Sequence, residues 1–439
     1  MPYFNPAIET MPREQLKVLQ LQKLQSMLAQ IYGRNRFYTA KFKAAGLEPD
    51  AIQSLEDLAH LPVTTKDELV RAQAGDPPFG TNATFPETAY TRIHQTSGTT
   101  GPPMRVLDTQ ESWNWWGRCW GYVLAGAGLA ASDRLFIPFS FGPFIGFWAA
   151  VEGAKEIGAL MIPGGGRDSL QRLHLIFESG ATAMCCTPTY ALRLAEVAQE
   201  AGIDLRESSV RITVHAGEPG ANVPGTKARI QAAWGARCFD HAGASEVGAH
   251  SFECEVQPGG THVIESEFIT EVVDPKTGAP VSPGEVGELV ITNLGRIGYP
   301  VIRYRTGDLV CLNLDPCGCG RTFARFQGGI LGRADDMVVV RGVNIFPGAV
   351  ENLIRQFDPV DEFQVKVAMR REMYELEISI ELAEGVDLKS TQSTIETSIY
   401  EALGLRPTIS IVPRGSLPRF ELKADRFHIE HQNLPPLAK

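Results

Sequence analysis

Residues 94–106, HQTSGTTGPPMRV, concentrate small hydroxyl side chains and glycines beside two consecutive prolines. Glycines let a backbone approach a ligand closely, and hydroxyl and amide groups donate hydrogen bonds to phosphate oxygens. The segment therefore predicts a loop that wraps a polyphosphate, with a plain surface turn as the alternative. It is not a Walker A loop, because the order G-x-x-x-x-G-K-[ST] is absent and the segment contains no lysine.

A second group of residues could ligate a metal: Cys254, His262, Cys317 and Cys319. Three cysteines and one histidine form an ordinary tetrahedral set for structural zinc. The C-x-C pair lies in PCGCGR, whose glycines suit a tight metal-binding turn. We predict a structural zinc site here, with free thiols in a turn as the alternative.

Charge and composition exclude several classes of protein. A formal net charge of -10 argues against a phosphate-backbone binder, so no nucleic-acid partner is expected. The N-terminal residues lack a basic segment followed by an apolar run, so we expect no secretory signal and a cytoplasmic location. The longest apolar stretch, residues 135–151, is interrupted by prolines and glycines and is short for a membrane span.

These candidate sites need a fold that positions them. Residues 12–45 have leucines at helical spacing and predict an N-terminal helical cap. Between residues 134 and 202, apolar runs alternate with amphipathic segments, which indicates βαβ units and a mainly parallel sheet. Residues 261–325 contain short strands between Gly and Pro turns and predict a β-rich subdomain.

The pattern changes again after GILGRADDM, where the order strand, helix, strand, strand, helix, strand indicates a small α+β domain. We therefore predict an α/β protein with two domains. Residues 1–333 would form a large domain of mainly parallel sheets flanked by helices, including the β-rich subdomain. Residues 334–439 would form the small, mobile C-terminal domain.

Five ordered motifs resemble those of acyl-adenylate-forming enzymes: TSGTTGPP, GASEVG, YRTGDL, GRADDMVVVRG and LPRFELKADRF. The resemblance covers roughly residues 55–427. It is closest to the phenylacetate–CoA ligase branch, through CTPTYALRLAE, AGEPG, ITNLGRIGYPVIRYRTGDL, CGCGR and RGVNIFPGAVE.

The resemblance implies an ATP site. The residues implied for the phosphates are Ser97, Gly98, Thr99, Thr100 and Gly101. Glu246 would hold the Mg²⁺ that neutralises the triphosphate, with a helix-capping carboxylate as the alternative. Asp308 would accept hydrogen bonds from the ribose hydroxyls, supported by Arg305 and Arg333. The other implied nucleotide contacts are Gly217, Glu218, Pro219, Ala242, Gly243 and Ser245.

The resemblance also implies two orientations of the small domain. Lys423 would be the catalytic lysine that bridges the attacking carboxylate and the α-phosphate. Asp335 would be the hinge residue for a large rotation, and Gly342 would then line the tunnel for the CoA thiol. Without the resemblance, Lys423 would be interpreted as a solvated surface lysine.

Two positions depart from the pattern of the family. Ala242 stands where an aromatic residue usually stacks on adenine, so the base must be held differently. The phosphate loop continues as Gly-Pro-Pro-Met-Arg where Gly-Lys-Pro-Thr is common, and Arg105 is the candidate replacement for the missing lysine.

A carboxylate substrate is expected between FSFGPFIGF, CTPTY and HAGEPG, where aromatic rings would form flat apolar walls. The predicted substrate residues are Phe139, Phe141, Phe144, Phe147, Tyr190, His215, Ala216 and Gly243. Ordinary core packing is the alternative for each aromatic residue, and a structural histidine is the alternative for His215.

We predict an ATP- and Mg²⁺-dependent, AMP-forming aryl or arylacetic acid–CoA ligase, with a small aromatic carboxylic acid, ATP and CoA as its partners. A near alternative is adenylation followed by transfer to a carrier protein or an amine. A distant one is a non-catalytic protein that binds a nucleotide and an aryl acid. No membrane association is expected, and a homodimer is predicted from the resemblance.

Overall fold

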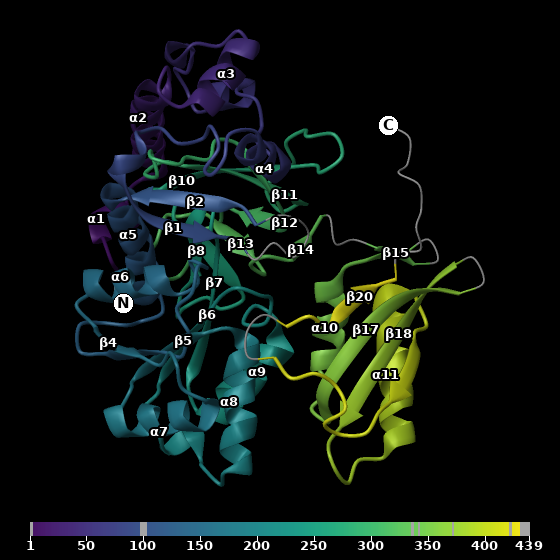
Figure 1. Cartoon of the computed structure of the whole chain (residues 1–439). Coiled ribbons are helices and arrows are strands. Elements are labelled where there is room, and N and C mark those ends of the chain that lie inside the picture. The colour runs from purple at the N-terminus through teal and green to yellow at the C-terminus, as the bar shows by residue number, and fades with distance from the viewer. Residues whose placement is uncertain are drawn as a thin grey trace.

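A computed structural model describes residues 3–96, 103–334, 338–340, 343–370, 373–420 and 424–430, and the statements below concern these residues. The element order begins with helices, continues through alternating strands and helices, and ends in a separate α+β unit (Figure 1). None of the described helices combines the length and apolar character needed to cross a membrane.

The predicted N-terminal cap is a group of helices that pack on the edge of the large sheet. Gly33, at a φ of +77°, separates the two main helices in a conformation that favours glycine. Leucines and methionines of the first helix pack against Tyr38 and Phe42 of the second. The helices are α1 (Pro6–Glu9), α2 (Arg13–Ile31), α3 (Arg36–Ala44) and α4 (Lys66–Gly75).

Five parallel strands form the predicted βαβ part of the sheet, in the spatial order β4-β3-β5-β6-β7. Alternate residues of each strand face opposite layers. Leu135 and Ile137 pack toward α5 and α6, whereas Phe136 packs toward α7, α8 and α9. The strands are β3 (Arg134–Ile137), β4 (Leu160–Pro163), β5 (Ala183–Cys186), β6 (Ile212–His215) and β7 (Arg237–Ala244).

The covering helices complete this layered unit, because both faces of a parallel sheet must be buried. They are α5 (Gln110–Gly126), α6 (Trp148–Glu156), α7 (Ser169–Ser179), α8 (Pro188–Glu200) and α9 (Pro224–Trp234). A separate antiparallel hairpin of β1 (Tyr90–Gln95) and β2 (Arg105–Thr109) flanks the predicted phosphate loop.

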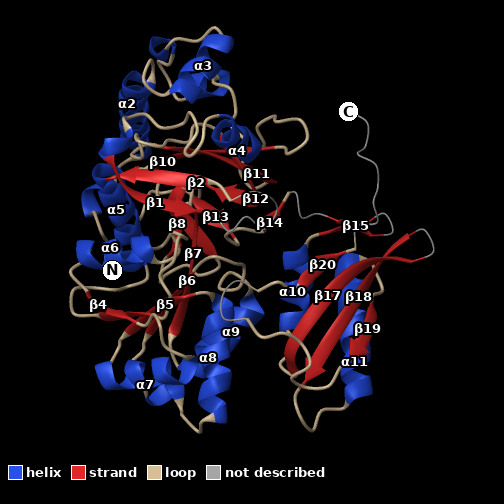
Figure 2. Ribbon diagram, viewed as in Figure 1, coloured by secondary structure: helices blue, strands red, loops and turns tan. Residues whose placement is uncertain are grey.

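The β-rich segment joins the parallel strands rather than forming a sheet of its own. Hydrogen bonds continue from β7 through antiparallel β8, β9, β13, β12, β11 and β10 in one path, so the described sheet has twelve strands including β14 (Figure 2). These strands are β8 (Gly248–Glu253), β9 (Gly260–Val263), β10 (Phe268–Val273), β11 (Val286–Asn293), β12 (Tyr304–Asn313), β13 (Arg325–Gln327) and β14 (Gly332–Arg333).

The residues from Val338 onward have their own hydrophobic core, built on a four-stranded sheet in the order β19-β18-β17-β20. The predicted element order recurs with one difference. The first predicted strand pairs instead in a hairpin of β15 (Val338–Val340) with β16 (Val343–Ile345), and β20 (Phe427–Ile429) takes the sheet edge beside β17. The remaining elements are α10 (Pro347–Arg355), β17 (Val360–Arg370), β18 (Met373–Leu382), α11 (Leu388–Leu403) and β19 (Thr408–Ile411).

The small unit contacts the large one through α9 and α10, which lie side by side (Figure 1). Arg229 of α9 donates a hydrogen bond to the Val360 carbonyl at 2.7 Å. A Cβ atom at Gly225 would lie 2.4 Å from the Arg355 carbonyl oxygen, so this crossing requires glycine. The two units therefore meet in close backbone contact.

Candidate active site

Several predicted site residues lie outside the described residues: Ser97, Gly98, Thr99, Thr100, Gly101, Asp335, Gly342 and Lys423. The hairpin that leads into the phosphate loop is described. Two hydrogen bonds join Thr96 and Met104 at its end. The Thr96 amide donates to the Met104 carbonyl at 2.9 Å, and the Met104 amide donates to the Thr96 hydroxyl at 3.0 Å. The two ends of the loop are therefore held beside each other.

A buried ion pair connects this hairpin to the GASEVG turn. Arg296 donates two hydrogen bonds to Asp108 of β2, at 2.7 and 2.6 Å, and both side chains are fully buried. The same guanidinium donates to the Ser245 carbonyl at 2.6 Å. The backbone of Ser245 therefore has a fixed position relative to the phosphate loop. Neither Arg296 nor Asp108 was predicted as a site residue.

Glu246 lies in the tight turn between β7 and β8 and is buried. The hydroxyl of Tyr304, at the start of β12, donates to its Oε1 at 2.8 Å. Burial and the neighbouring Glu246 carboxylate raise the pKa of Tyr304 well above its ordinary value, so this hydroxyl stays a donor. The carboxylate is thereby oriented, and its other lone pairs suit a hard cation such as Mg²⁺.

The structure brings two of the three predicted ribose residues together. Asp308 of β12 pairs in register with Arg333 of β14, and the guanidinium donates to Asp308 Oδ1 at 3.2 Å. Arg305 does not join them. Its guanidinium is held by Glu288 at 3.0 Å and by the Pro275 carbonyl at 2.8 Å. Two nitrogens of Arg305 are therefore engaged by a neighbouring strand and turn, and its implied support for the ribose or a phosphate stays a prediction.

Ala242 and Gly243 end β7 where the strand turns sharply into β8. A Cβ atom at Gly243 would lie 2.7 Å from the Gly248 carbonyl oxygen, so the close return of the chain excludes a side chain there. Ala242 is buried and offers only a methyl group on this surface. An adenine base beside Ala242 would approach the backbone of β7 more closely than it could if an aromatic side chain occupied this position.

Gly217, Glu218 and Pro219 form the loop after β6. Gly217 has a φ of +96°, which a residue with a side chain rarely adopts. The Glu218 carboxylate binds two backbone amides, Thr189 N at 2.9 Å and Ala424 N at 2.6 Å. This acid therefore contacts both the large unit and the small one.

The predicted aromatic wall is partly assembled. Phe139 packs edge-on against Phe141 and Phe147, with ring centroids 5.5 and 5.7 Å apart, in the loop that follows β3. Phe144 belongs to the same loop but is 39% exposed. Aromatic rings prefer to pack edge to face, so an aromatic substrate could pack against these phenylalanines in the same way.

Tyr190 does not join the phenylalanines. It belongs to α8 and packs in the core on the opposite face of the sheet. Its hydroxyl accepts a hydrogen bond from buried Arg172 at 2.5 Å and lies 3.0 Å from the Ser169 hydroxyl. These contacts explain why the side chain is only 2% exposed.

His215 is the last residue of β6 and Ala216 follows it; Ala216 packs against the same core as the three phenylalanines. His215 is fully buried and its Nδ1 lies 3.0 Å from the Cys186 carbonyl, whereas Nε2 has no partner among the described residues. Burial lowers the pKa of His215 to about 4, so the ring is neutral at pH 7.

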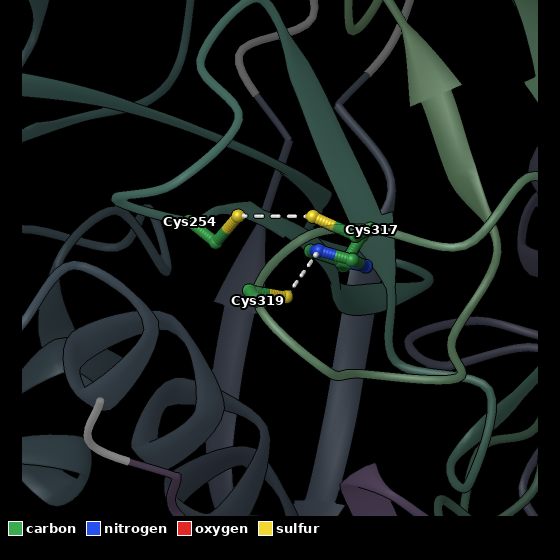
Figure 3. A group of neighbouring side chains, drawn as sticks. Cys254, Cys317 and Cys319 are labelled. Atoms are coloured by element: carbon green, nitrogen blue, oxygen red, sulfur yellow. Dashed lines mark hydrogen bonds between the residues drawn. The ribbon is translucent and has the colours of Figure 1, made fainter.

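The four predicted metal ligands converge at β8, β9 and the PCGCGR turn, and all are buried (Figure 3). Cys254 Sγ lies 3.7 Å from Cys317 Sγ, and Cys319 Sγ lies 3.4 Å from His262 Nε2. The other ring nitrogen of His262 is 3.1 Å from the Phe323 carbonyl, which keeps Nε2 directed at the sulfurs. The hydrogen bond from Cys254 lowers the pKa of Cys319 to about 2, which favours its thiolate.

Comparisons with known proteins show the family of the chain. A family model for AMP-binding enzymes matches residues 43–295, and a model for the AMP-binding enzyme C-terminal domain matches residues 342–430. A phenylacetate-coenzyme A ligase from Thermus thermophilus is 32% identical over 95% of this chain and 97% of its own. One from Escherichia coli is 35% identical over 95% of this chain and 96% of its own.

The fold and site thus define an adenylate-forming enzyme. Within that class, the chain belongs to the AMP-binding enzyme family and to its phenylacetate–CoA ligase branch.

Solved structures also distinguish between arrangements of the two units. A 2-hydroxyisobutyryl-CoA ligase with its acyl-AMP, in the postadenylation state, has a TM-score of 0.93 at 30% identity, covering 98% of this chain and 92% of that one. The same ligase with CoA in the thioesterification state has a TM-score of 0.74 at 31% identity, covering 97% and 92%. The arrangement of the two units here is thus more similar to that of the postadenylation complex than to that of the thioesterification complex.

Proposed function

We propose that this protein is an AMP-forming ligase that activates an aromatic carboxylic acid with ATP and transfers the acyl group to the thiol of CoA. The observation that supports this most directly is the pairing of Glu246 with Tyr304 and of Asp308 with Arg333 on adjoining elements of one sheet. These pairs supply an oriented carboxylate for a metal–phosphate complex and a polar site for a ribose. The CoA ligases among the relatives favour CoA as acceptor.

In the first half-reaction, a substrate carboxylate oxygen attacks the α-phosphorus of ATP. A bond forms between the carboxylate oxygen and the α-phosphorus. The bond from the α-phosphorus to the bridging oxygen breaks, and pyrophosphate leaves with its electron pair. Mg²⁺, when bound, neutralises charge on the phosphates, and Glu246 is the residue that would hold it. Lys423 and the loop Ser97–Gly101 are proposed to bind the α-phosphate and the departing pyrophosphate, and Asp308 and Arg333 to bind the ribose.

In the second half-reaction, the sulfur of CoA attacks the acyl carbonyl carbon. A C–S bond forms, AMP leaves with the electrons of the C–O bond, and the thiol proton is released. We propose that rotation of the small domain at Asp335 brings Gly342 to the path of the thiol, where a side chain would obstruct it.

The proposed substrate class is an aromatic acid, because Phe139, Phe141 and Phe147 form an edge-to-face cluster between β3 and α6. A second class deserves a direct comparison, since a structural relative at 30% identity binds 2-hydroxyisobutyryl-AMP. A polar substituent on the acid would find a partner in His215 Nε2.

The defining experiment measures carboxylate-dependent pyrophosphate release with benzoic, hydroxybenzoic, aminobenzoic and arylacetic acids and with 2-hydroxyisobutyrate, each with and without CoA. Turnover with one aromatic acid and only with CoA is expected. Turnover with an amine or a carrier protein instead of CoA would replace the proposed acceptor. Release with the aliphatic acid alone would replace the proposed substrate class.

The role of Lys423 is tested by separating the half-reactions. Lys423→Ala should abolish pyrophosphate release from acid and ATP while largely retaining thioester formation from supplied acyl-AMP. Lys389→Ala, at an exposed position of α11 in the same domain, is the matched control and should retain both. Equal loss of both half-reactions in Lys423→Ala would contradict the role.

We also propose that Cys254, His262, Cys317 and Cys319 bind one structural zinc ion. Zinc held tetrahedrally at about 2.3 Å from sulfur and about 2.0 Å from nitrogen separates two thiolates by about 3.8 Å and a thiolate from an imidazole nitrogen by about 3.6 Å. The observed separations of 3.7 and 3.4 Å fit that geometry. The 3.7 Å between the sulfurs of Cys254 and Cys317 is too long for a disulfide, whose sulfurs lie about 2.05 Å apart.

The zinc proposal is tested by metal analysis of the purified protein, with about one zinc per chain expected. Cys317→Ser should lose the metal and lower the melting temperature, because binding free energy contributes to folding. Cys311→Ser is the matched control, since Cys311 is buried in β12 outside the cluster and should leave the metal content unchanged. A stable, metal-free wild-type protein would contradict the proposal.

Two further parts of the proposal concern the cell. A cytoplasmic location is proposed because ATP, CoA and reduced thiols coexist there. A homodimer is proposed from the resemblance alone, and sedimentation equilibrium would test it.

A further inference from the structure

Glu218 connects the two domains through a single carboxylate. Its Oε1 accepts from the amide of Thr189 at 2.9 Å, and its Oε2 accepts from the amide of Ala424 at 2.6 Å. Thr189 is the second residue of α8, so its amide has no acceptor within the helix. Ala424 belongs to the small domain. One acid therefore satisfies a helix N-terminus of the large domain and a backbone donor of the small domain at once.

A second contact joins the same two segments. Arg426 donates to the Thr189 hydroxyl at 3.3 Å. Its guanidinium is fixed within the small domain by two hydrogen bonds to Glu362, at 2.7 and 3.0 Å, and its side chain is only 9% exposed. The segment from Ala424 to Arg426 is thus attached to the large domain at both ends, through Glu218 at Ala424 and through Thr189 of α8 at Arg426.

Other polar contacts also join the domains. Arg229 donates to the Val360 carbonyl at 2.7 Å. Arg419 lies 3.6 Å from Glu196, and the Glu196 side chain is 35% exposed. An ion pair at that distance and exposure contributes little to stability. Among the described side chains, Glu218 is the one whose two oxygens are divided between the domains.

We infer that Glu218 is a positioning residue that holds the small domain in the arrangement used for adenylation and releases it for thioester formation. The inference rests on the proposed function. Lys423 directly precedes Ala424 in the sequence, so a contact that fixes Ala424 restrains the segment that carries the proposed catalytic lysine. The arrangement that contains this contact matches the postadenylation relative, with a TM-score of 0.93 against 0.74 for the thioesterification state.

The chemistry of the contact suits release. Both donors are backbone amides, and Glu218 is half-buried, so water can take over each hydrogen bond when the domains separate. Among the residues that the structure describes, Glu218 forms no ion pair that would have to be broken. The resemblance implied a nucleotide contact for this residue, whereas its carboxylate is engaged by two protein amides.

The first test measures the contact without using activity. Glu218→Gln keeps the size of the side chain but replaces one acceptor oxygen with an NH₂ group, which cannot accept from the second amide. Hydrogen exchange of the peptide that begins at Ala424 should be about tenfold faster in this variant than in the wild type. Glu196→Gln is the matched control and should leave that exchange unchanged. Equal exchange in wild type and Glu218→Gln would overturn the inference.

The second test separates the half-reactions. Glu218→Gln should slow pyrophosphate release by about tenfold or more, the range for losing a hydrogen bond to a charged acceptor, and change thioester formation from supplied acyl-AMP by about twofold or less. ATP affinity, measured by calorimetry, should be unchanged, which distinguishes positioning from a nucleotide contact. Equal slowing of both half-reactions would overturn the inference. A wild type that forms no acyl-AMP would contradict the proposed function, whereas the exchange comparison would still decide the contact.

Discussion

Two polar contacts position parts of the candidate active site, and they differ in burial and in the kind of partners that they join. Arg296 and Asp108 form a bidentate ion pair within the large domain, and both side chains are fully buried. Glu218 joins the large domain to the small one through two backbone amides, at a half-buried position. The first contact fixes the hairpin of β1 and β2 to the GASEVG turn, and the second connects two domains that the proposed rotation would separate.

The two contacts differ in the free energy that is lost when they break. An ion pair removed from water loses much free energy when one partner disappears, since the remaining charge is left uncompensated in a medium of low polarity. A carboxylate that binds amides near the surface can exchange them for water at small cost. The fold thus has a firmly built contact beside the proposed nucleotide site and a more easily broken contact where the small domain is proposed to move.

The largest effect is expected from Asp108→Asn. This substitution leaves the Arg296 guanidinium buried without a charged partner and should lower the free energy of unfolding by about 3 to 5 kcal/mol. Urea denaturation of the full chain measures it. Glu218→Gln, analysed in the same way, should leave the unfolding free energy nearly unchanged, which is the contrast that the comparison requires.

The matched control for the buried pair is an exposed one. Arg206 donates two hydrogen bonds to Asp204, at 2.9 and 2.6 Å, on the surface of the large domain. Asp204→Asn makes the same chemical change where water screens the charges, so no change in the denaturation midpoint is expected. A loss as large as that in Asp108→Asn would show that burial is not the cause.

A smaller effect is expected from pH. Burial lowers the pKa of four histidines, to about 4 for His94, His215 and His241 and to about 3 for His250. Between these values and about 6.5 the unfolded chain binds protons that the folded protein does not, so stability falls as the pH falls. Each histidine contributes up to about 1.4 kcal/mol per pH unit. Urea titrations between pH 7 and 5 measure the slope.

Asp240 opposes this slope. Burial, followed by the nearby Glu253 carboxylate, raises its pKa to about 7, so between about pH 4 and 7 the folded protein holds a proton that the unfolded chain has lost. Asp240→Asn should therefore make the loss of stability toward pH 5 steeper, and His241→Asn should make it shallower. Stability that rises from pH 7 to 5 would contradict the assigned directions.

The rigid parts of the molecule were largely predictable from the sequence. The parallel strands are apolar on both faces because helices cover both, as Leu135, Phe136 and Ile137 show, so their pattern is strong. Cysteine and histidine are uncommon residues with few roles, and the set of Cys254, His262, Cys317 and Cys319 could be assembled before any contact was known.

The contacts that connect distant segments were not predictable. Asp108 and Arg296 are 188 positions apart, and nothing in either local pattern identifies the partner. Strand β20 has only three residues, too few for an alternating pattern, so its place at the sheet edge depends on tertiary pairing with β17. Arg305 lies inside a recognised motif, yet Glu288 on the neighbouring strand determines where its guanidinium lies.

The smallest and most specific effect concerns Tyr304, which stands in the recognised YRTGDL motif but was not assigned a role. Tyr304→Phe removes the hydroxyl that orients Glu246 and leaves the packing of the ring unchanged. Pyrophosphate release should fall about tenfold, and the Mg²⁺ concentration for half-maximal rate should rise, because the carboxylate is less well positioned for the cation.

Tyr122→Phe is the matched control for this change. Its hydroxyl is buried and bonded to Ser266 at 3.3 Å. The same deletion of one oxygen atom there should leave both the rate and the Mg²⁺ requirement unchanged. If both variants change the rate and the Mg²⁺ requirement to the same extent, Tyr304 contributes to the fold rather than to the site. If only Tyr304→Phe changes the Mg²⁺ requirement, the rigid half of the active site extends from the Asp108–Arg296 pair to the carboxylate proposed to hold the metal.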